Sequence, residues 1–227
     1  RHPEPGWMEF RTSGRIADLL HLYGCDEVLT DQQVCKAEAR MGVPEGGGMT
    51  GVIGMLHCGM GPTVALRFDI DALPVRECEE LDHFPAQEGF RSEHAGYMHA
   101  CGHDGHITVG LGTAKLLCQM REQLHGTVKF IFQPAEEGVR GARAIVENGH
   151  LEDVDFLLAA HMYGGSEQHP CGICITAGHG LATTKLDVDF HGKASHAAAA
   201  PEQGNNALLA AATAVLNLQA IPRHGKA

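Results

Sequence analysis

Aromatic side chains are scarce in this 227-residue sequence, which contains one Trp and three Tyr. Proteins that bind single-stranded nucleic acid stack bases on several such rings, so this scarcity argues against that class of partner. Basic side chains are in the minority too: 17 Lys and Arg stand against 28 Asp and Glu, for a formal net charge of −11. Phosphate backbones and anionic membranes repel such a chain. We expect no nucleic-acid partner.

Long apolar runs are also missing. No stretch approaches the roughly 20 residues that a membrane span requires, so no membrane partner is expected. The chain opens with Arg rather than Met and shows no signal peptide, so its N-terminus looks trimmed. Eight cysteines are present, but a chain of this length with 44% apolar residues needs no disulfide scaffold. We therefore expect a reducing, cytoplasmic location.

Three familiar catalytic or nucleotide motifs are absent. The sequence has no Gly-x-x-x-x-Gly-Lys loop, no Gly-x-Gly-x-x-Gly fingerprint after a strand and no Gly-x-Ser-x-Gly elbow. These absences argue against a nucleotide-binding enzyme and against a serine hydrolase. Ser195 and His196 are adjacent, but no acidic partner is evident for them.

Hydrophobic periodicity predicts alternating strands and helices over most of the chain. Three segments favour helices, namely 9–23, 106–120 and 141–148, and four favour strands, namely 52–56, 64–68, 127–132 and 154–160. Residues 42–51 hold five glycines and a proline and are expected to form a loop. A strand, a helix and a strand in succession form a βαβ unit. The predicted fold is therefore α/β, with a mostly parallel sheet flanked by helices.

The pattern changes near residue 180. Residues 183–190 alternate as a half-exposed antiparallel strand does, and 205–219 form an Ala/Leu-rich helix. We predict two domains, 1–180 and 181–227, the second of them incomplete. Cys171 and Cys174 have the spacing of a redox or zinc motif, but no second pair accompanies them. They are interpreted as structural cysteines.

The densest group of metal-binding side chains lies in residues 98–106 (MHACGHDGH). This stretch contains His99, Cys101, His103, Asp104 and His106. Imidazole, thiolate and carboxylate are the ligands of divalent transition metals. Cys101 and His103 are the first candidates, and His99 is either a ligand or a supporting residue. The alternative is a polar helix start, with Asp104 capping a helix that begins at His106.

Further candidates follow the predicted strands. Asp69 and Asp71 follow the strand at 64–68, and Glu136 and Glu137 follow the next strand. His161 follows a third strand, and that strand is expected to be buried. Chemistry in parallel sheets gathers at the carboxyl ends of the strands. The adjacent glutamates are expected to point in different directions, so that one binds metal and the other acts as a base. Solvated acidic turns and a satisfied core histidine are the alternatives.

With these residues identified, the chain resembles the dinuclear metal amidohydrolases, which include hippurate hydrolase, N-acyl-amino-acid amidohydrolases and plant auxin-conjugate hydrolases. Four blocks carry the resemblance: 65–74 (ALRFDIDALP), 98–106, 132–138 (FQPAEEG) with 141–142, and 190–197 (FHGKASHA). The opening residues 2–12 and residues 36–44 look most like one branch of the family, the A subunits of aminobenzoyl-glutamate hydrolase. The loop at 42–51 is shorter than that branch leads us to expect.

The resemblance implies a role for each matching residue. Cys101, His103, Glu137 and His161 would bind two divalent ions, Zn²⁺ or Mn²⁺. Glu136 would be the general base, and Asp71 would assist from behind the ligands. His196 would lie in an inserted α+β lid and dimerisation domain and stabilise the oxyanion in the partner subunit's site.

The resemblance also implies the reaction and the partners. An amide between an acyl or aminobenzoyl group and an amino acid would be hydrolysed, with p-aminobenzoyl-glutamate the favoured substrate. The alternatives are a general N-acyl-amino-acid deacylase and a non-catalytic metal-binding subunit. Through the lid domain the protein would form a homodimer, or a heterodimer with a related subunit. The family's last metal-binding histidine has no counterpart before Ala227, so we expect these 227 residues alone to be inactive.

Overall fold

The computed structural model describes residues 1–80, 82–138, 140–162, 172–173 and 186–221. The chain divides into two compact units, Arg1–Ile175 and Thr176–Ala227, which are described separately. The helices and strands of the first unit are α1 (Phe10–Tyr23), β1 (Glu27–Thr30), β2 (Val52–His57), β3 (Thr63–Asp69), α2 (Phe84–Gln87), α3 (His103–Gln119), β4 (Thr127–Gln133), α4 (Gly141–Val146) and β5 (Phe156–Ala159). No helix of the described residues combines the length and apolarity needed to cross a bilayer.

The strands form one sheet in the order β1-β2-β4-β3-β5. β3 pairs in parallel with both β4 and β5, whereas β2 pairs antiparallel with both β1 and β4. Four strands thus run in one direction, and only β2 opposes them. The predicted α/β fold with a mostly parallel sheet is confirmed.

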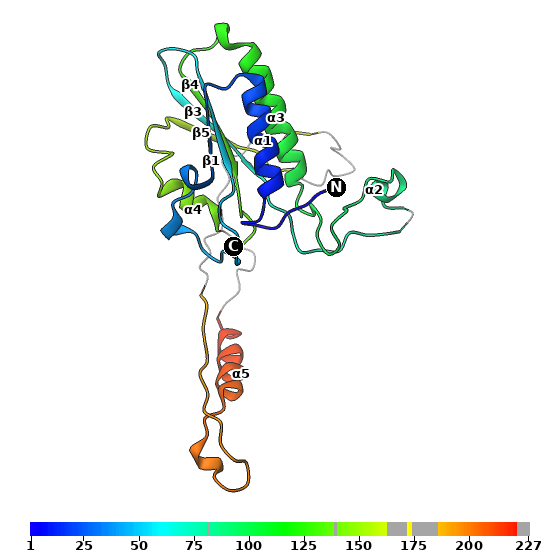
Figure 1. Cartoon of the computed structure of the whole chain (residues 1–227), viewed down its shortest axis with the longest axis vertical. Coiled ribbons are helices and arrows are strands. Elements are labelled where there is room, and N and C mark those ends of the chain that lie inside the picture. The colour runs from blue at the N-terminus through cyan, green and yellow to red at the C-terminus, as the bar shows by residue number, and fades with distance from the viewer. Residues whose placement is uncertain (81, 139, 163–171, 174–185, 222–227) are drawn as a thin grey trace. The chain divides into compact units, whose positions relative to one another are not determined.

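Helices cover both faces of this sheet (Figure 1). On one face, Phe130 and Phe132 of β4 pack in a buried cluster with Ile16 and Leu20 of α1. On the other face, Ile131 packs with Ile145 of α4. Successive strand residues point to opposite faces, so both clusters draw on the same strand. Burying one such Phe or Ile side chain contributes about 1.5–3 kcal/mol to stability.

Three neighbouring parallel strands end at the same edge of the sheet. β3 ends at Asp69, β4 ends at Gln133 and β5 ends at Ala159, with Asp69 opposite Gln133 in the register. The segments that follow these strands are therefore brought together. This confirms the expectation that polar residues after separate strands meet at one edge.

Two local expectations were wrong. α3 begins at His103, not at His106, because Gly102 adopts a left-handed conformation (φ 82°) and lets the chain turn into the helix there. Asp104 lies in the first turn and is not the cap. Strand β5, expected to be buried, is the edge strand of the sheet, and Phe156 and Leu158 on it are 62% and 60% exposed.

The second unit contains a single described α-helix, α5 (Ala207–Leu218), which is the helix predicted at 205–219. The Asn206 side chain caps it by accepting a hydrogen bond from Leu209 N (3.2 Å). The strand predicted at 183–190 is not formed over 186–190, and 183–185 lie outside the described residues. Antiparallel pairing occurs instead as one bridge between Lys193 and Asn205. The predicted boundary at 180 and both cysteines of the 171–174 motif also lie outside the described residues.

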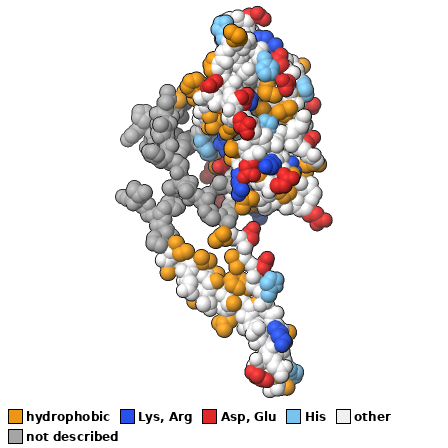
Figure 2. All heavy atoms as spheres, turned by 90° about the vertical axis from the view of Figure 1, so that its left-hand side faces the viewer, with side chains coloured by type: hydrophobic (Ala, Val, Ile, Leu, Met, Phe, Trp, Pro, Cys, Tyr) orange, Lys and Arg blue, Asp and Glu red, His pale blue; other side chains and the backbone are white. Residues whose placement is uncertain are grey.

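Apolar side chains of the second unit lie on its surface. Figure 2 shows hydrophobic side chains gathered along this unit, and on α5 both Leu208 and Leu216 are about three-quarters exposed, at 76% and 75%. Contiguous apolar surface of this kind is rare on a monomer and often marks an interaction site. This unit therefore has the surface character of an element that packs against another part of a protein.

Candidate metal centre

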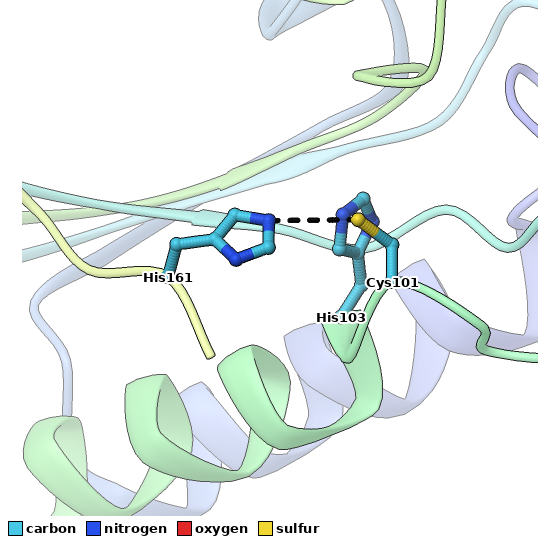
Figure 3. Close-up of side chains that lie close together, drawn as sticks. All are labelled: Cys101, His103 and His161. Carbon is cyan, nitrogen blue, oxygen red and sulfur yellow. Dashed lines mark hydrogen bonds between the residues drawn. The ribbon is translucent and has the colours of Figure 1, made fainter. Parts of the chain in front are cut away.

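Cys101, His103 and His161 lie together, as Figure 3 shows. One potential ligand atom from each falls within 4.8 Å of the others, and we call these residues the first donor set. The Cys101 sulfur is 3.5 Å from Nε2 of His161. Cys101 precedes α3, His103 is its first residue, and His161 follows β5. The structure thus joins residues from distant parts of the sequence in a group with the chemistry of a metal site.

Glu136 and Glu137 form a second donor set with the same His103. Nε2 of His103 lies 3.9 Å from Oε2 of Glu136 and 3.9 Å from Oε1 of Glu137. Contrary to expectation, the two carboxylates do not point in different directions. They follow β4 in a turn rather than in an extended strand, and both approach one nitrogen.

The hydrogen bonds of the histidines determine which nitrogen faces the cluster. Nδ1 of His103 donates to the Asp71 carbonyl oxygen (2.8 Å), and Nδ1 of His161 donates to the Met162 carbonyl oxygen (2.7 Å). A carbonyl oxygen can only accept, so Nε2 of each neutral ring carries the lone pair. Metal-binding histidines are oriented in this way by a carbonyl or carboxylate behind them.

Asp71 supports both donor sets without joining them. Asp71 is 1% exposed, and its two carboxylate oxygens accept hydrogen bonds from Glu136 N (3.0 Å) and Glu137 N (2.9 Å). One of these oxygens also lies 3.3 Å from Nδ1 of His103. Asp71 therefore fixes the glutamate turn and the imidazole relative to each other.

Asp69 and His106 form a third group with His103, although their ligand atoms are already engaged. Nδ1 of His106 bonds the Asp69 carboxylate, and Nε2 of His106 accepts from Met162 N (2.7 Å). Asp69 also pairs with Arg67 (2.7 Å). His106 thus anchors the residue next to His161, and we interpret it as a support rather than a ligand.

Among the described residues, three buried atoms of the three groups have no hydrogen-bond partner, namely Nε2 of His103, Oε1 of Glu137 and Oδ2 of Asp69. Of these, Asp69 Oδ2 is ion-paired with Arg67, whereas Nε2 of His103 and Oε1 of Glu137 face each other across the second donor set. An unsatisfied buried polar atom costs about 1–3 kcal/mol, and a cation between these atoms would remove that cost. Thiolate, imidazole and carboxylate together suit a divalent transition metal. The residues present therefore fit such an ion.

The protonation equilibria reflect a crowded acidic site. Burial raises the pKa of Glu136 above its usual range, and the Asp69 carboxylate raises it further. Burial and the Glu137 charge raise the pKa of the Cys101 thiol to about 11. Burial alone would lower the pKa of His103, but the Asp71 hydrogen bond and the Asp69 charge raise it overall. The cluster as it stands carries excess negative charge, which a cation would balance.

Other candidates lie outside the donor sets. His99 is half-buried, and burial lowers its pKa. Asp104 is exposed. His196 belongs to the second unit, where its Nδ1 accepts from Ala198 N (3.2 Å) and Ala199 N (3.0 Å).

Sequence reasoning missed two residues that support the centre. Arg67, on β3, pairs with Asp69 and donates to the Gln133 side chain (2.9 Å). Glu9 is fully buried and accepts from Ala135 N (2.8 Å), next to the glutamate pair. Neither carries a local signal, because a strand arginine and a glutamate before a helix are ordinary residues.

Comparison with known proteins shows which family the chain resembles. The family model described as peptidase family M20/M25/M40 matches residues 65–225. The chain is 43% identical over 251 residues to the A subunit of p-aminobenzoyl-glutamate hydrolase from Escherichia coli K12, covering 99% of this chain and 57% of that protein. It is 43% identical over 249 residues to indole-3-acetyl-aspartic acid hydrolase of Enterobacter agglomerans, covering 98% and 56%. The chain thus spans little more than half the length of these relatives.

A solved structure supports the same fold. A dinuclear metal binding peptidase of the M20 family from Bacillus subtilis superposes with a TM-score of 0.58 at 40% identity. The match covers 70% of this chain and 39% of that one. The sheet, its helices and the resemblance recognised in the sequence are therefore consistent with one another.

Proposed function

Since this chain belongs to peptidase family M20/M25/M40, we propose that it provides the active site of a metal-dependent amidohydrolase. The scissile bond would be the amide between an acyl or aminobenzoyl group and an amino acid. The observation that supports this most directly is the sharing of His103 by two donor sets, one with Cys101 and His161 and one with both glutamates. Such sharing suits a centre with more than one cation.

Cys101, His103, Glu137 and His161 would hold two divalent cations. When bound, these cations would lower the pKa of a water molecule and polarise the substrate carbonyl. Thiolate and imidazole ligands favour Zn²⁺, and the carboxylates also tolerate Mn²⁺. Asp71 would keep the His103 ring and the glutamate turn in register while the substrate reacts.

Glu136 would act as the general base. Its carboxylate would take a proton from the attacking water and then deliver that proton to the leaving nitrogen as the C–N bond breaks. His196 would donate a hydrogen bond to the oxyanion in the partner subunit's site. Because its Nδ1 already accepts amide protons, the neutral ring carries its proton on Nε2.

A cavity of about 880 Å³ adjoins Glu137 and offers room for the substrate's acyl or aryl arm. Its wall is mostly apolar and includes Met8, Val43, Leu73 and Tyr97. Arg140 also lines the cavity, and it donates to the carbonyl oxygens of Glu137 (3.0 Å) and Gly42 (3.1 Å). An apolar wall next to a polar reacting centre is typical of small-molecule sites.

p-Aminobenzoyl-glutamate is the substrate we favour, because a 43% identical relative is named for its hydrolysis. A second relative of equal identity is named for indole-3-acetyl-aspartic acid, which keeps a general N-acyl-amino-acid hydrolase as the alternative. We further propose a cytoplasmic enzyme that assembles through residues 181–227, either with a second copy or with a related subunit. Residues 1–180 would be the catalytic domain.

The experiment that tests this function is Glu136→Gln in the active enzyme, with metal content measured alongside turnover. We expect turnover to fall by about 10²–10⁴-fold while bound Zn²⁺ or Mn²⁺ is retained. Glu147→Gln, on the surface, is the matched control and should retain activity. A panel of p-aminobenzoyl-glutamate, hippurate and acetylated amino acids then ranks the substrates. A protein that binds metal but hydrolyses none of them would be a non-catalytic metal-binding subunit, contrary to the proposal.

A further inference from the structure

Glu9 is a fully buried carboxylate that the proposed reaction does not use. It stands immediately before α1, yet its side chain makes no capping hydrogen bond to that helix. Its oxygens instead accept from the Thr50 hydroxyl (2.7 Å) and from Ala135 N (2.8 Å). Neither partner carries a charge, so the burial of this carboxylate is expensive for the fold. A buried group that destabilises the fold in this way is expected to have a role in the backbone segment that it holds.

That segment is the corner between β4 and the glutamate pair. Ala135 has a φ of +47°, a left-handed conformation that costs a residue with a side chain about 1–2 kcal/mol. The Ala135 carbonyl oxygen accepts from Arg140 N (3.2 Å) and Gly141 N (2.9 Å). Both polar groups of the Ala135 backbone are thus fixed, and among the described residues only Glu9 accepts from the N–H group.

Three successive amides of this corner donate to two buried carboxylates. Ala135 N donates to Glu9, and Glu136 N and Glu137 N donate to Asp71. Asp71 reaches the corner from the end of β3, whereas Glu9 reaches it from a position 126 residues away in the sequence. The two carboxylates therefore hold the turn from different parts of the chain. Glu9 binds the amide of Ala135, the residue before the proposed general base, and Asp71 binds the amides of Glu136 and Glu137.

We propose that Glu9 is a positioning residue for Glu136, whose direction it sets by holding the Ala135 amide in the left-handed conformation. The proposal rests on Glu136 acting as the general base. Without the Glu9 acceptor, Ala135 would relax toward a commoner φ, and the peptide plane that leads into Glu136 would rotate. A base displaced by about 1 Å loses up to about 10²-fold in rate, although the substrate still binds.

The test compares Glu9→Met, Glu9→Gln and Ser13→Ala in the active enzyme. Met fills the space but accepts no strong hydrogen bond, so kcat should fall by about 10- to 100-fold with KM nearly unchanged. Gln should restore most of the rate, because its amide oxygen accepts from Ala135 N while its NH₂ group donates to Thr50. Ser13→Ala is the control: it removes a buried hydrogen bond from Gly51 N (3.0 Å) in the same region without touching Ala135, so kcat should stay near wild type.

Hydrogen–deuterium exchange of the amides at 135–137 gives a readout that does not depend on activity. Glu9→Met should accelerate their exchange, and Ser13→Ala should not. Equal kcat and equal exchange in these two variants would overturn the proposal. If wild type hydrolyses no amide, the proposed function fails. Hydrogen–deuterium exchange alone then still tests whether Glu9 holds the amides at 135–137. If Glu9→Met does not fold, Thr50→Val is used instead, because it removes the hydroxyl that donates to the Glu9 carboxylate. This variant should shift kcat and exchange in the same direction as Glu9→Met. The absence of a shift would overturn the proposal.

Discussion

The Asp71 carbonyl oxygen accepts a hydrogen bond from Nδ1 of His103 at 2.8 Å, and this contact directs Nε2 toward the glutamate pair. The carboxylate of the same Asp71 holds the amides of both glutamates. One buried residue therefore orients an imidazole through its backbone and a turn through its side chain. Asp71 thereby links the His103 ring to the backbone of both glutamates.

Asp71→Asn should separate these two functions. The backbone carbonyl remains, so the tautomer of His103 is unchanged, but the Asn NH₂ group cannot accept from one of the two glutamate amides. We expect metal affinity and kcat each to fall by about 10- to 100-fold, measured by isothermal titration calorimetry and a turnover assay. Asp104→Asn is the control, because Asp104 is exposed in the first turn of α3. Wild-type affinity and turnover in Asp71→Asn would contradict this role.

Metal binding should release a proton from Cys101. Without a cation its thiol pKa is about 11, raised by burial and by Glu137, so the thiol is protonated at pH 7.5. Metal ligation requires the thiolate, so wild type should release about one more proton per site than Cys101→Ser does. Calorimetry in buffers of different ionisation enthalpy measures that difference. The exposed Cys78→Ser variant should release as many protons as wild type.

The sequence predicts the framework of the fold well, because periodicity reports burial directly. Ile16 and Leu20 lie on the buried face of α1, and Gly24 ends that helix with a φ of 91°. Polar residues that follow apolar strands meet at one edge because parallel strands share a direction. For the same reason His161 could be nominated before its contacts were known, whereas Cys101 and His103 were nominated because ligand side chains are dense in residues 98–106.

What periodicity does not report is which strand or segment becomes a neighbour. β2 and β3 are consecutive in the chain, yet β4 lies between them in the sheet. The contact between Glu9 and Ala135 has no local signature, since the pattern around each residue is satisfied without the other. The start of α3 was misplaced because Gly102 uses a left-handed φ, which only a glycine adopts at low cost.

The buried Glu9 should make the stability of the fold depend on pH. Burial raises its pKa from 4.5 to about 7, so between these values the unfolded chain has lost the proton that the folded chain retains. The free energy of unfolding therefore falls as pH rises through this window, by on the order of 3 kcal/mol in total. Glu9→Gln removes this titrating group. The free energy of unfolding of the variant, relative to that of wild type, should therefore rise between pH 5 and pH 8 in urea unfolding with a chelator present. Ser13→Ala removes no titratable group, so its free energy of unfolding should differ from that of wild type by the same amount at pH 5 and at pH 8.

Two glycines of α3 should respond to alanine with opposite signs. A Cβ at Gly110 would lie 2.7 Å from the Phe68 ring and 2.8 Å from the Phe132 ring, so Gly110→Ala should destabilise the fold by about 1–3 kcal/mol. A Cβ at Gly112 would meet nothing within 4 Å. Gly112→Ala should therefore stabilise the helix by up to about 1 kcal/mol. Thermal unfolding of the two variants checks this, and equal shifts would mean that α3 does not pack on the sheet through Gly110.

The cavity beside Glu137 should control which acyl groups are accepted. Val43 lies on its wall and is 38% exposed, so a larger side chain there narrows the cavity without entering the core. In Val43→Trp we expect kcat/KM for p-aminobenzoyl-glutamate to fall by about tenfold, a loss of about 1.4 kcal/mol, while acetylated amino acids are affected little because their acyl arm is short. Val75→Trp, at an exposed position that does not line the cavity, should leave both substrates unchanged. Equal losses for long and short acyl groups would indicate that the arm binds elsewhere.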